Sequence, residues 1–154
     1  MNAKAITNAS NAPEISPDQI QPASIDLRLS HHGLRTRASF LAGQAGKIDL
    51  AAHSMNLGEF SITEAGMVLE RGGMYLIPLM ESVNLPPDMS LFCNPKSSTG
   101  RLDIFARVIC DGGQAFDQIP AGYKGGLWVE LSPRSFPIKI YPGSRLVQGR
   151  FKID

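Results

Sequence analysis

Apolar and polar residues alternate in short stretches along most of the chain. Ile25, Leu27 and Leu29 alternate with Asp26 and Arg28, which is the two-residue period of a strand with one buried face. The alternation resumes over residues 34–40, where it predicts a second half-buried strand. Further apolar stretches that predict strands cover residues 67–69, 74–79, 89–93, 104–109, 127–131, 136–140 and 145–151.

Glycine and proline separate these predicted strands. Turn signals stand at residues 71–73, 85–88, 111–113, 121–126 and 141–143. The 15 glycines and 11 prolines leave little room for long helices, so we expect short helical turns only. Many short strands that end in turns predict an all-β fold, either a sandwich or a barrel of the jelly-roll kind.

The length and the first residues bound the domain organisation. A chain of 154 residues is long enough for one domain and too short for two ordinary ones. Residues 1–19 are small, polar and interrupted by proline, so we expect a flexible N-terminal arm. We expect residues 20–154 to form a single β-barrel domain.

Composition and charge exclude several classes of protein. Hydrophobic residues make up 43% of the chain and charged residues 19%, which is typical of a soluble globular protein. No apolar run approaches the length of a membrane span, and no signal-peptide pattern begins the chain, so we expect a cytoplasmic protein. A net charge of +1 is too small for the basic face that binds a nucleic-acid polymer.

The chain has two cysteines, Cys93 and Cys110, and no Cys-x-x-Cys or His-x-Glu pattern. This spacing favours neither a zinc site nor a disulfide framework. We expect two buried, reduced thiols.

A cluster of polar groups lies at residues 96–101 (KSSTGR), between two predicted strands. Hydroxyls and backbone N–H groups near a glycine, flanked by two cations, suit the oxygens of a phosphate chain. An ordinary solvated turn is the alternative, because the same residue types favour turns.

A second candidate site lies at residues 125–131 (GGLWVEL). Strand alternation places Trp128 and Glu130 on one face and the apolar side chains on the other. A carboxylate beside a large aromatic side chain can have a raised pKa and accept a proton near neutral pH. A solvent-facing glutamate on an ordinary strand is the alternative.

The order of several short motifs resembles the trimeric dCTP deaminase and dUTPase superfamily. These motifs are QPASIDLRL at 21–29, ESVNLPPDM at 81–89, PKSSTGR at 95–101, GYKG at 122–125 before the strand with Glu130, and PGSRLVQ at 142–148. The resemblance covers residues 20–151 and is strongest to α-proteobacterial dCTP deaminases, whose long chain carries two such modules. It implies a distorted jelly-roll barrel of the dUTPase-like (β-clip) type.

The resemblance also implies roles for individual residues. Glu130 takes the position of the catalytic glutamate, which activates the water that attacks C4 of cytosine. Ser97 and Arg101 take the positions of catalytic loop residues, and Cys110 that of a backbone carbonyl which orients the water or the amine. The implied nucleotide-binding residues are Lys96, Ser97, Ser98, Thr99, Gly100, Arg101, Cys110, Trp128, Val129 and Glu130.

By the same resemblance, the implied reaction converts dCTP into dUTP and ammonia, with no metal in the hydrolytic step. Mg²⁺ arrives with the nucleotide triphosphate, and no zinc is expected. The implied assembly is a homotrimer with sites between subunits, or a pairing with a second module. A dUTP diphosphatase and a non-catalytic nucleotide-binding or scaffold module are the alternatives.

Three features depart from the pattern of the family. Pro120 stands where the family usually has an aspartate for the sugar 3′-hydroxyl, which argues against the diphosphatase; Asp111 or Asp117 could replace that acid. The C-terminal tail that closes the site in both families is expected to come from a neighbouring chain or a second module, or to be absent. The N-terminal helix of the dCTP deaminases is not recognisable in residues 1–19.

Overall fold

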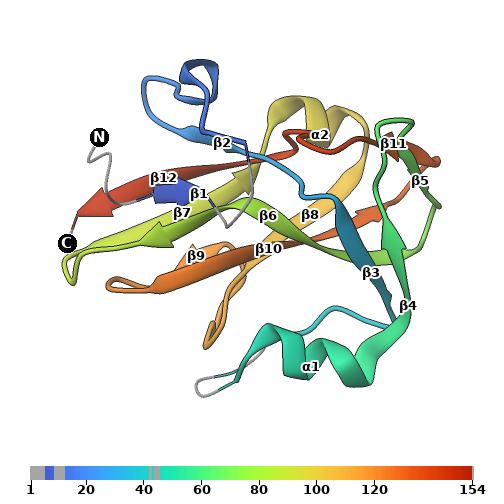
Figure 1. Cartoon of the computed structure of the whole chain (residues 1–154), viewed down its shortest axis with the longest axis horizontal. Coiled ribbons are helices and arrows are strands. Elements are labelled where there is room, and N and C mark those ends of the chain that lie inside the picture. Colours follow the sequence, from blue (N-terminus) through green and yellow to red (C-terminus); the bar gives the residue numbers. More distant parts are fainter. Residues whose placement is uncertain (1–5, 9–12, 42, 44–45, 154) are drawn as a thin grey trace.

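The protein folds into three antiparallel sheets (Figure 1). This computed structural model describes residues 6–8, 13–41, 43 and 46–153. The strands are β1 (Ile6–Asn8), β2 (Ile25–Leu27), β3 (His32–Thr36), β4 (Asn56–Ser61), β5 (Met67–Leu69), β6 (Met74–Asn84), β7 (Met89–Pro95), β8 (Ile104–Ile109), β9 (Gln118–Ile119), β10 (Lys124–Pro133), β11 (Ile138–Ile140) and β12 (Val147–Ile153). One sheet has the order β4-β3-β6-β10-β8 with β1 also paired to β6, the second has the order β2-β12-β7-β9, and β5 pairs with β11.

The predicted all-β architecture is confirmed, and the helical elements are short. They are the 3-10 helix η1 (Pro17–Gln19), α1 (Ile48–Met55) and α2 (Ser97–Arg101). Figure 1 shows α1 and α2 on opposite sides of the molecule, with the sheets between them. Within the described ranges, no helix is long and apolar enough to cross a membrane.

Strand β10 lies between β6 and β8 and carries the second candidate site. Glu130 is the register partner of Leu76 on β6 and of Arg107 on β8. The apolar side chains at positions 127, 129 and 131 are buried in the main core. Trp128 instead packs against a smaller apolar cluster that includes Leu76. The alternation predicted for this strand is therefore confirmed.

Strand β3 is shorter than the sequence predicts. The alternation over residues 34–40 indicated a strand to Phe40, but β3 ends at Thr36. The pairing of β3 with β4 shifts register between Arg35 and Thr36, and the chain then leaves the sheet. The N–H group of Arg37 donates to the carbonyl of Met55 at 3.0 Å, so residues 37–41 are drawn towards the end of α1.

Several described residues within 1–19, the segment predicted to be an N-terminal arm, contact the rest of the chain. Ile6 is buried, and β1 pairs with β6. Ser16 caps η1, and its N–H group donates to Oε1 of Gln19 at 3.0 Å. Gln19 is completely buried. The contacts of Ser16 and Gln19 are made by single polar groups, and no periodicity in the sequence predicts them.

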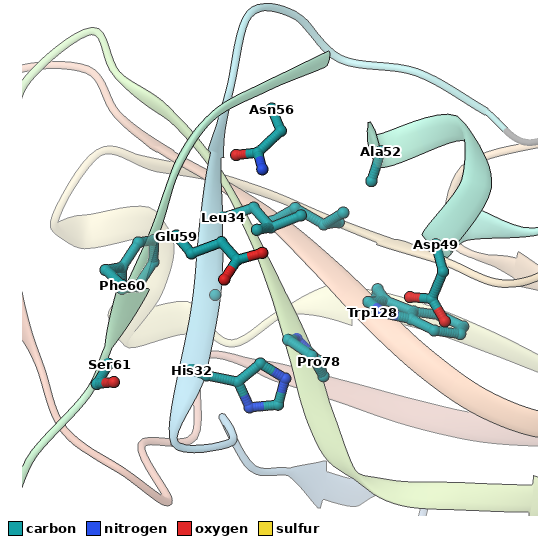
Figure 2. Close-up of a pocket in the computed structure, with 12 residues that line it drawn as sticks. His32, Leu34, Asp49, Ala52, Asn56, Glu59, Phe60, Ser61, Pro78 and Trp128 are labelled. Carbon is teal, nitrogen blue, oxygen red and sulfur yellow. The ribbon is translucent and has the colours of Figure 1, made fainter. Parts of the chain in front are cut away.

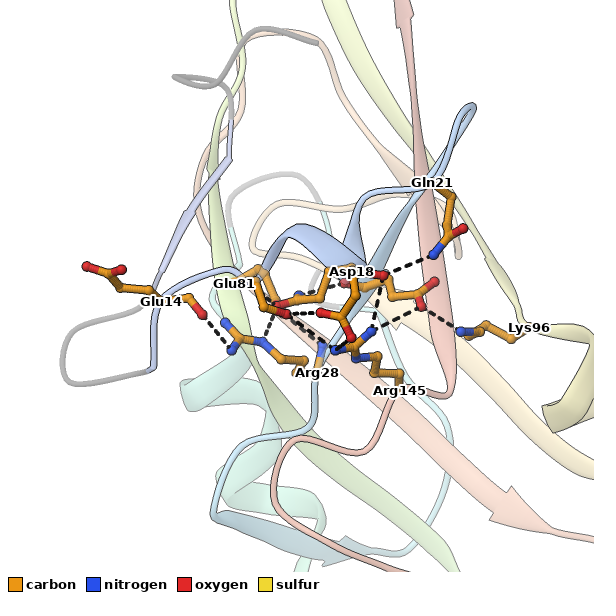
Figure 3. Close-up of polar contacts among 10 residues, drawn as sticks. Glu14, Asp18, Gln21, Arg28, Glu81, Lys96 and Arg145 are labelled. Carbon is orange, nitrogen blue, oxygen red and sulfur yellow. Dashed lines mark hydrogen bonds and ion pairs between the residues drawn. The ribbon is translucent and has the colours of Figure 1, made fainter.

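The prediction of one exposed face is wrong for residues 25–29, because the polar side chains of Asp26, in β2, and Arg28, just after it, are also buried. Nε of Arg28 donates to Oε1 of Glu81 at 2.8 Å, and the Arg28 N–H group donates to Oε2 at 2.9 Å. Gln19 donates to the same carboxylate at 2.9 Å, and Lys96 pairs with Asp26 at 2.6 Å (Figure 3). Hydrogen bonds and ion pairs replace water around these groups, which makes their burial tolerable.

Candidate functional site

The carboxylate of Glu130 is buried and held by two donors from a distant part of the chain. Glu130 is 1% exposed, so the solvent-facing alternative is wrong. The hydroxyl of Ser39 donates to Oε2, and the N–H group of Phe40 donates to Oε1 at 3.0 Å. Burial raises the pKa of Glu130, while Ser39, Phe40 and the charge of Arg107 act to lower it. Burial therefore moves the pKa of this carboxylate in the direction that a general base requires.

Arg107 is the charged neighbour of Glu130 on β8. Its guanidinium group lies over the rings of Phe105 at 4.3 Å and Phe116 at 4.4 Å. These stacking contacts hold the cation beside β10. Sequence reasoning assigned Arg107 no role, because its position becomes visible only through its pairing with Glu130.

Trp128 is half-buried and borders a cavity of about 470 Å³. Residues of β3, β4, β6 and α1 form the other walls, and Glu130 is not among the lining residues. Figure 2 shows Asp49 beside the indole ring and the His32 and Glu59 side chains around the same space. His32 had no predicted role, because nothing in its local sequence indicates that it faces a cavity.

Cys110 and Val129 lie in the interior rather than at an accessible surface. The carbonyl of Cys110 accepts a hydrogen bond from the N–H group of Gly113 at 3.1 Å, and a carbonyl has a second lone pair for another donor. Burial, with a smaller contribution from Asp111, raises the pKa of the Cys110 thiol to about 11. Cys93 and Cys110 are both free and buried, as predicted.

The predicted phosphate loop forms α2 and the residue before it. Ser97, Ser98, Gly100 and Arg101 are exposed, whereas Thr99 is buried. The hydroxyl of Thr99 donates to the carbonyl of Leu146 at 2.6 Å, which anchors the loop. The side chains of Ser97, Ser98 and Arg101 are therefore accessible to solvent, and Thr99 anchors the helix that carries them.

Lys96 has an acidic partner within the same chain. Its Nζ lies 2.6 Å from Oδ2 of Asp26, and Arg145 approaches the same oxygen at 3.7 Å. The second oxygen, Oδ1, has no hydrogen-bond partner among the described residues. Asp26 therefore offsets part of the positive charge that the sequence places beside the loop.

One chain brings some of the predicted residues together and separates others. Trp128 and Glu130 lie on β10, and Cys110 directly follows the neighbouring strand β8. The Glu130 carboxylate contacts the segment that leads to α1, and α2 lies on the other side of the molecule (Figure 1). Among the described residues, no hydrogen bond or ion pair joins the loop Ser97–Arg101 to Glu130 within one protomer. In the described part of the chain, no three His, Cys, Asp or Glu side chains gather closely enough to hold a metal ion.

Comparison with known proteins decides the family. The model of the 2′-deoxycytidine 5′-triphosphate deaminase N-terminal domain matches residues 1–154, the whole chain. The chain belongs to this family. A dCTP deaminase from Agrobacterium tumefaciens has 49% sequence identity and a TM-score of 0.90, and the match covers 97% of this chain and 44% of that one. This chain therefore spans less than half of the A. tumefaciens protein.

Other relatives agree with this assignment. A protein of Sulfurihydrogenibium sp. named dCTP deaminase, dUMP-forming, is 33% identical over 133 residues, which are 84% of this chain and 67% of the relative. A dCTP deaminase of Haloarcula marismortui is 32% identical over 152 residues, which are 90% of this chain and 69% of the relative. The dUTPase of EIAV shares 13% identity with a TM-score of 0.55, over 96% of this chain and 88% of that one. This last likeness supports the dUTPase-like fold alone.

Asp111 and Asp117 were the candidates to replace the aspartate that the family usually has at the position of Pro120. In this chain both carboxylates accept hydrogen bonds from backbone N–H groups. Oδ1 of Asp111 accepts the N–H group of Ile48 at 2.7 Å, and Oδ1 of Asp117 accepts that of Val108 at 2.8 Å. Burial raises the pKa of Asp117. Both carboxylates therefore stabilise loops next to β8.

Proposed function

We propose that this chain is the catalytic module of a dCTP deaminase, which converts dCTP and water into dUTP and ammonia. The observation that supports this most is Glu130, a buried carboxylate with a raised pKa. It lies on the strand that follows the GYKG motif shared with the dCTP deaminases. A general base needs a pKa near the working pH, and burial moves a glutamate in that direction.

The proposed reaction uses Glu130 as a proton shuttle. The ionised carboxylate takes a proton from water while the water oxygen forms a bond to C4 of cytosine. The same proton moves to N3, and the former amino group leaves the tetrahedral C4 as ammonia after gaining the proton of the new hydroxyl group. The products are dUTP and ammonia, and fixed donors near C4 stabilise the intermediate.

We propose that the active site is shared between two copies of the chain. The exposed Ser97, Ser98 and Arg101 bind the triphosphate of a nucleotide whose base lies at Glu130 of another copy. Arg101 can hold two phosphate oxygens at once, and Mg²⁺ enters as part of the substrate. Lys96 contributes to phosphate binding only when its ion pair with Asp26 loosens.

The expected product is dUTP rather than dUMP. Release of dUMP requires the activation of a second water molecule near the α-phosphate. In the dUTPases an aspartate contributes to that activation, and Pro120 stands at its position here. Asp111 and Asp117 already accept backbone hydrogen bonds. The Sulfurihydrogenibium relative is named as a dUMP-forming enzyme, so an assay of this chain must distinguish dUTP from dUMP.

The test is an assay of the purified chain with dCTP or dUTP in the presence of Mg²⁺, in which ammonia, pyrophosphate and bound nucleotide are followed. We expect ammonia and dUTP from dCTP. Pyrophosphate without ammonia would favour the diphosphatase, ammonia together with pyrophosphate from dCTP would indicate a dUMP-forming deaminase, and nucleotide bound without any product would favour the non-catalytic module.

A further inference from the structure

We propose that Ser39 and the backbone N–H group of Phe40 position the carboxylate of Glu130 for proton transfer. This inference rests on the proposed function, because it assigns Ser39 a role in a reaction for which Glu130 is the base. The residues lie 91 and 90 positions away from Glu130 in the sequence, yet both donate to its side chain. Ser39 is a positioning residue, since it acts on the substrate only through Glu130.

The two donors bind different oxygens of the same carboxylate. Ser39 donates to Oε2 and Phe40 to Oε1, so together they fix both the position of the group and the plane of its oxygens. Each carboxylate oxygen has more than one lone pair, so a single hydrogen bond does not exhaust the acceptor capacity of either oxygen. Such orientation matters because a base must lie within hydrogen-bond reach of the proton that it abstracts.

The segment that carries these donors is itself anchored. The N–H group of Gly112 donates to the carbonyl of Gly46 at 2.8 Å, and Ile48 donates to Asp111 at 2.7 Å. Phe40 and Leu41 pack against the apolar cluster that contains Ile48, Ala52, Leu76 and Ile109. Contacts with α1 and with the turn after β8 thus hold residues 39 and 40 above Glu130.

The other elements around Glu130 contribute little charge. Its register partners are Leu76 on β6 and Arg107 on β8, and Leu34 on β3 is in turn paired with Leu76. Among the described residues, Arg107 is the group whose charge acts on the pKa of Glu130. Loss of the Ser39 hydroxyl removes an interaction that lowers this pKa, so the pKa is expected to rise.

The test compares Ser39→Ala and Ser39→Thr with the wild-type enzyme over a range of pH. For Ser39→Ala we expect kcat for Mg-dCTP to fall about tenfold, the size of effect that loss of a hydrogen bond to a charged group can produce. We expect KM to change little and the acidic limb of the kcat/KM profile to move to higher pH. Ser39→Thr keeps the hydroxyl and should restore most of the rate. Ser90→Ala on β7, in the other sheet, is the control and should match the wild type.

Wild-type kcat and pH profile in Ser39→Ala, with Glu130→Gln inactive, would overturn this inference and leave the proposed function standing. A raised kcat would show that the hydroxyl obstructs the base, which also overturns it. If Ser39→Ala does not fold, the same measurements are made on Ser39→Cys, whose thiol is a weak donor of similar size. Wild-type kcat and pH profile in that variant would likewise overturn the inference. Deamination by Glu130→Gln at the wild-type rate would instead overturn the proposed function.

Discussion

Replacing Glu130 with glutamine is expected to lower the turnover of dCTP by about a hundredfold to ten-thousandfold, the usual contribution of a general acid–base group. Glutamine fits the same space, but it cannot take a proton from water. Binding of Mg-dCTP should persist, because the proposed phosphate contacts come from the loop Ser97–Arg101. Ammonia release and calorimetric titration with Mg-dCTP measure the two effects separately.

The same variant has an expected effect on stability. Burial raises the pKa of Glu130 in the folded protein, so the ionised form lowers stability at pH values above that pKa, and this effect disappears as the pH falls. Glu130→Gln should therefore unfold at the wild-type temperature or higher at neutral pH. Glu64→Gln, at an exposed glutamate, is the control and should change neither property. Undiminished turnover in Glu130→Gln would remove Glu130 from the mechanism.

Replacing Glu81 with alanine is expected to lower the free energy of unfolding by about 3–5 kcal/mol. The Glu81 side chain is 0% exposed, and that of its partner Arg28 is 8% exposed. The carboxylate accepts hydrogen bonds from the backbone and side chain of Arg28 and from Gln19. Its loss removes the buried carboxylate that pairs with the Arg28 guanidinium group, and breaking a buried ion pair by removing one partner is strongly destabilising. Urea unfolding at equilibrium measures the change.

Asp18→Ala is the matched control for this prediction. Asp18 pairs with Arg145 at 3.0 Å, but its side chain is 72% exposed, and exposed ion pairs contribute little because water screens both charges. No measurable change in stability is expected. Equal losses in the two variants would contradict the distinction between buried and exposed pairs, and a Glu81→Ala protein as stable as the wild type would show that the buried pair is dispensable.

The sequence predicts the parts of this molecule that local periodicity controls. The alternation in β10 correctly placed Trp128 and Glu130 opposite the buried apolar side chains, since a strand alternates regardless of what packs on it. Glycine and proline correctly marked the ends of many strands. The motif order also indicated the correct family, because it depends on residue identity rather than on contacts.

Long-range polar contacts could not be predicted in the same way. Nothing in residues 34–40 indicates that the strand stops early and that Ser39 reaches Glu130. The alternating pattern predicts an exposed Arg28, whereas the structure shows it buried and paired with Glu81. Likewise, the sequence indicates no partner for Lys96, and only the structure shows its ion pair with Asp26. Each of these features depends on a single partner that is distant in sequence, and no periodic pattern encodes such a partner.

Complementation between Glu130→Gln and Arg101→Ala tests most directly the central claim, that the loop of one chain and Glu130 of another act on one nucleotide. Each variant alone should be inactive, because every site lacks one of its two parts. When the two are assembled into mixed oligomers, some sites receive an intact loop from one copy and an intact glutamate from the other, so deamination of dCTP should return in part. Mixed oligomers, verified by mass, that release no ammonia would contradict the shared site.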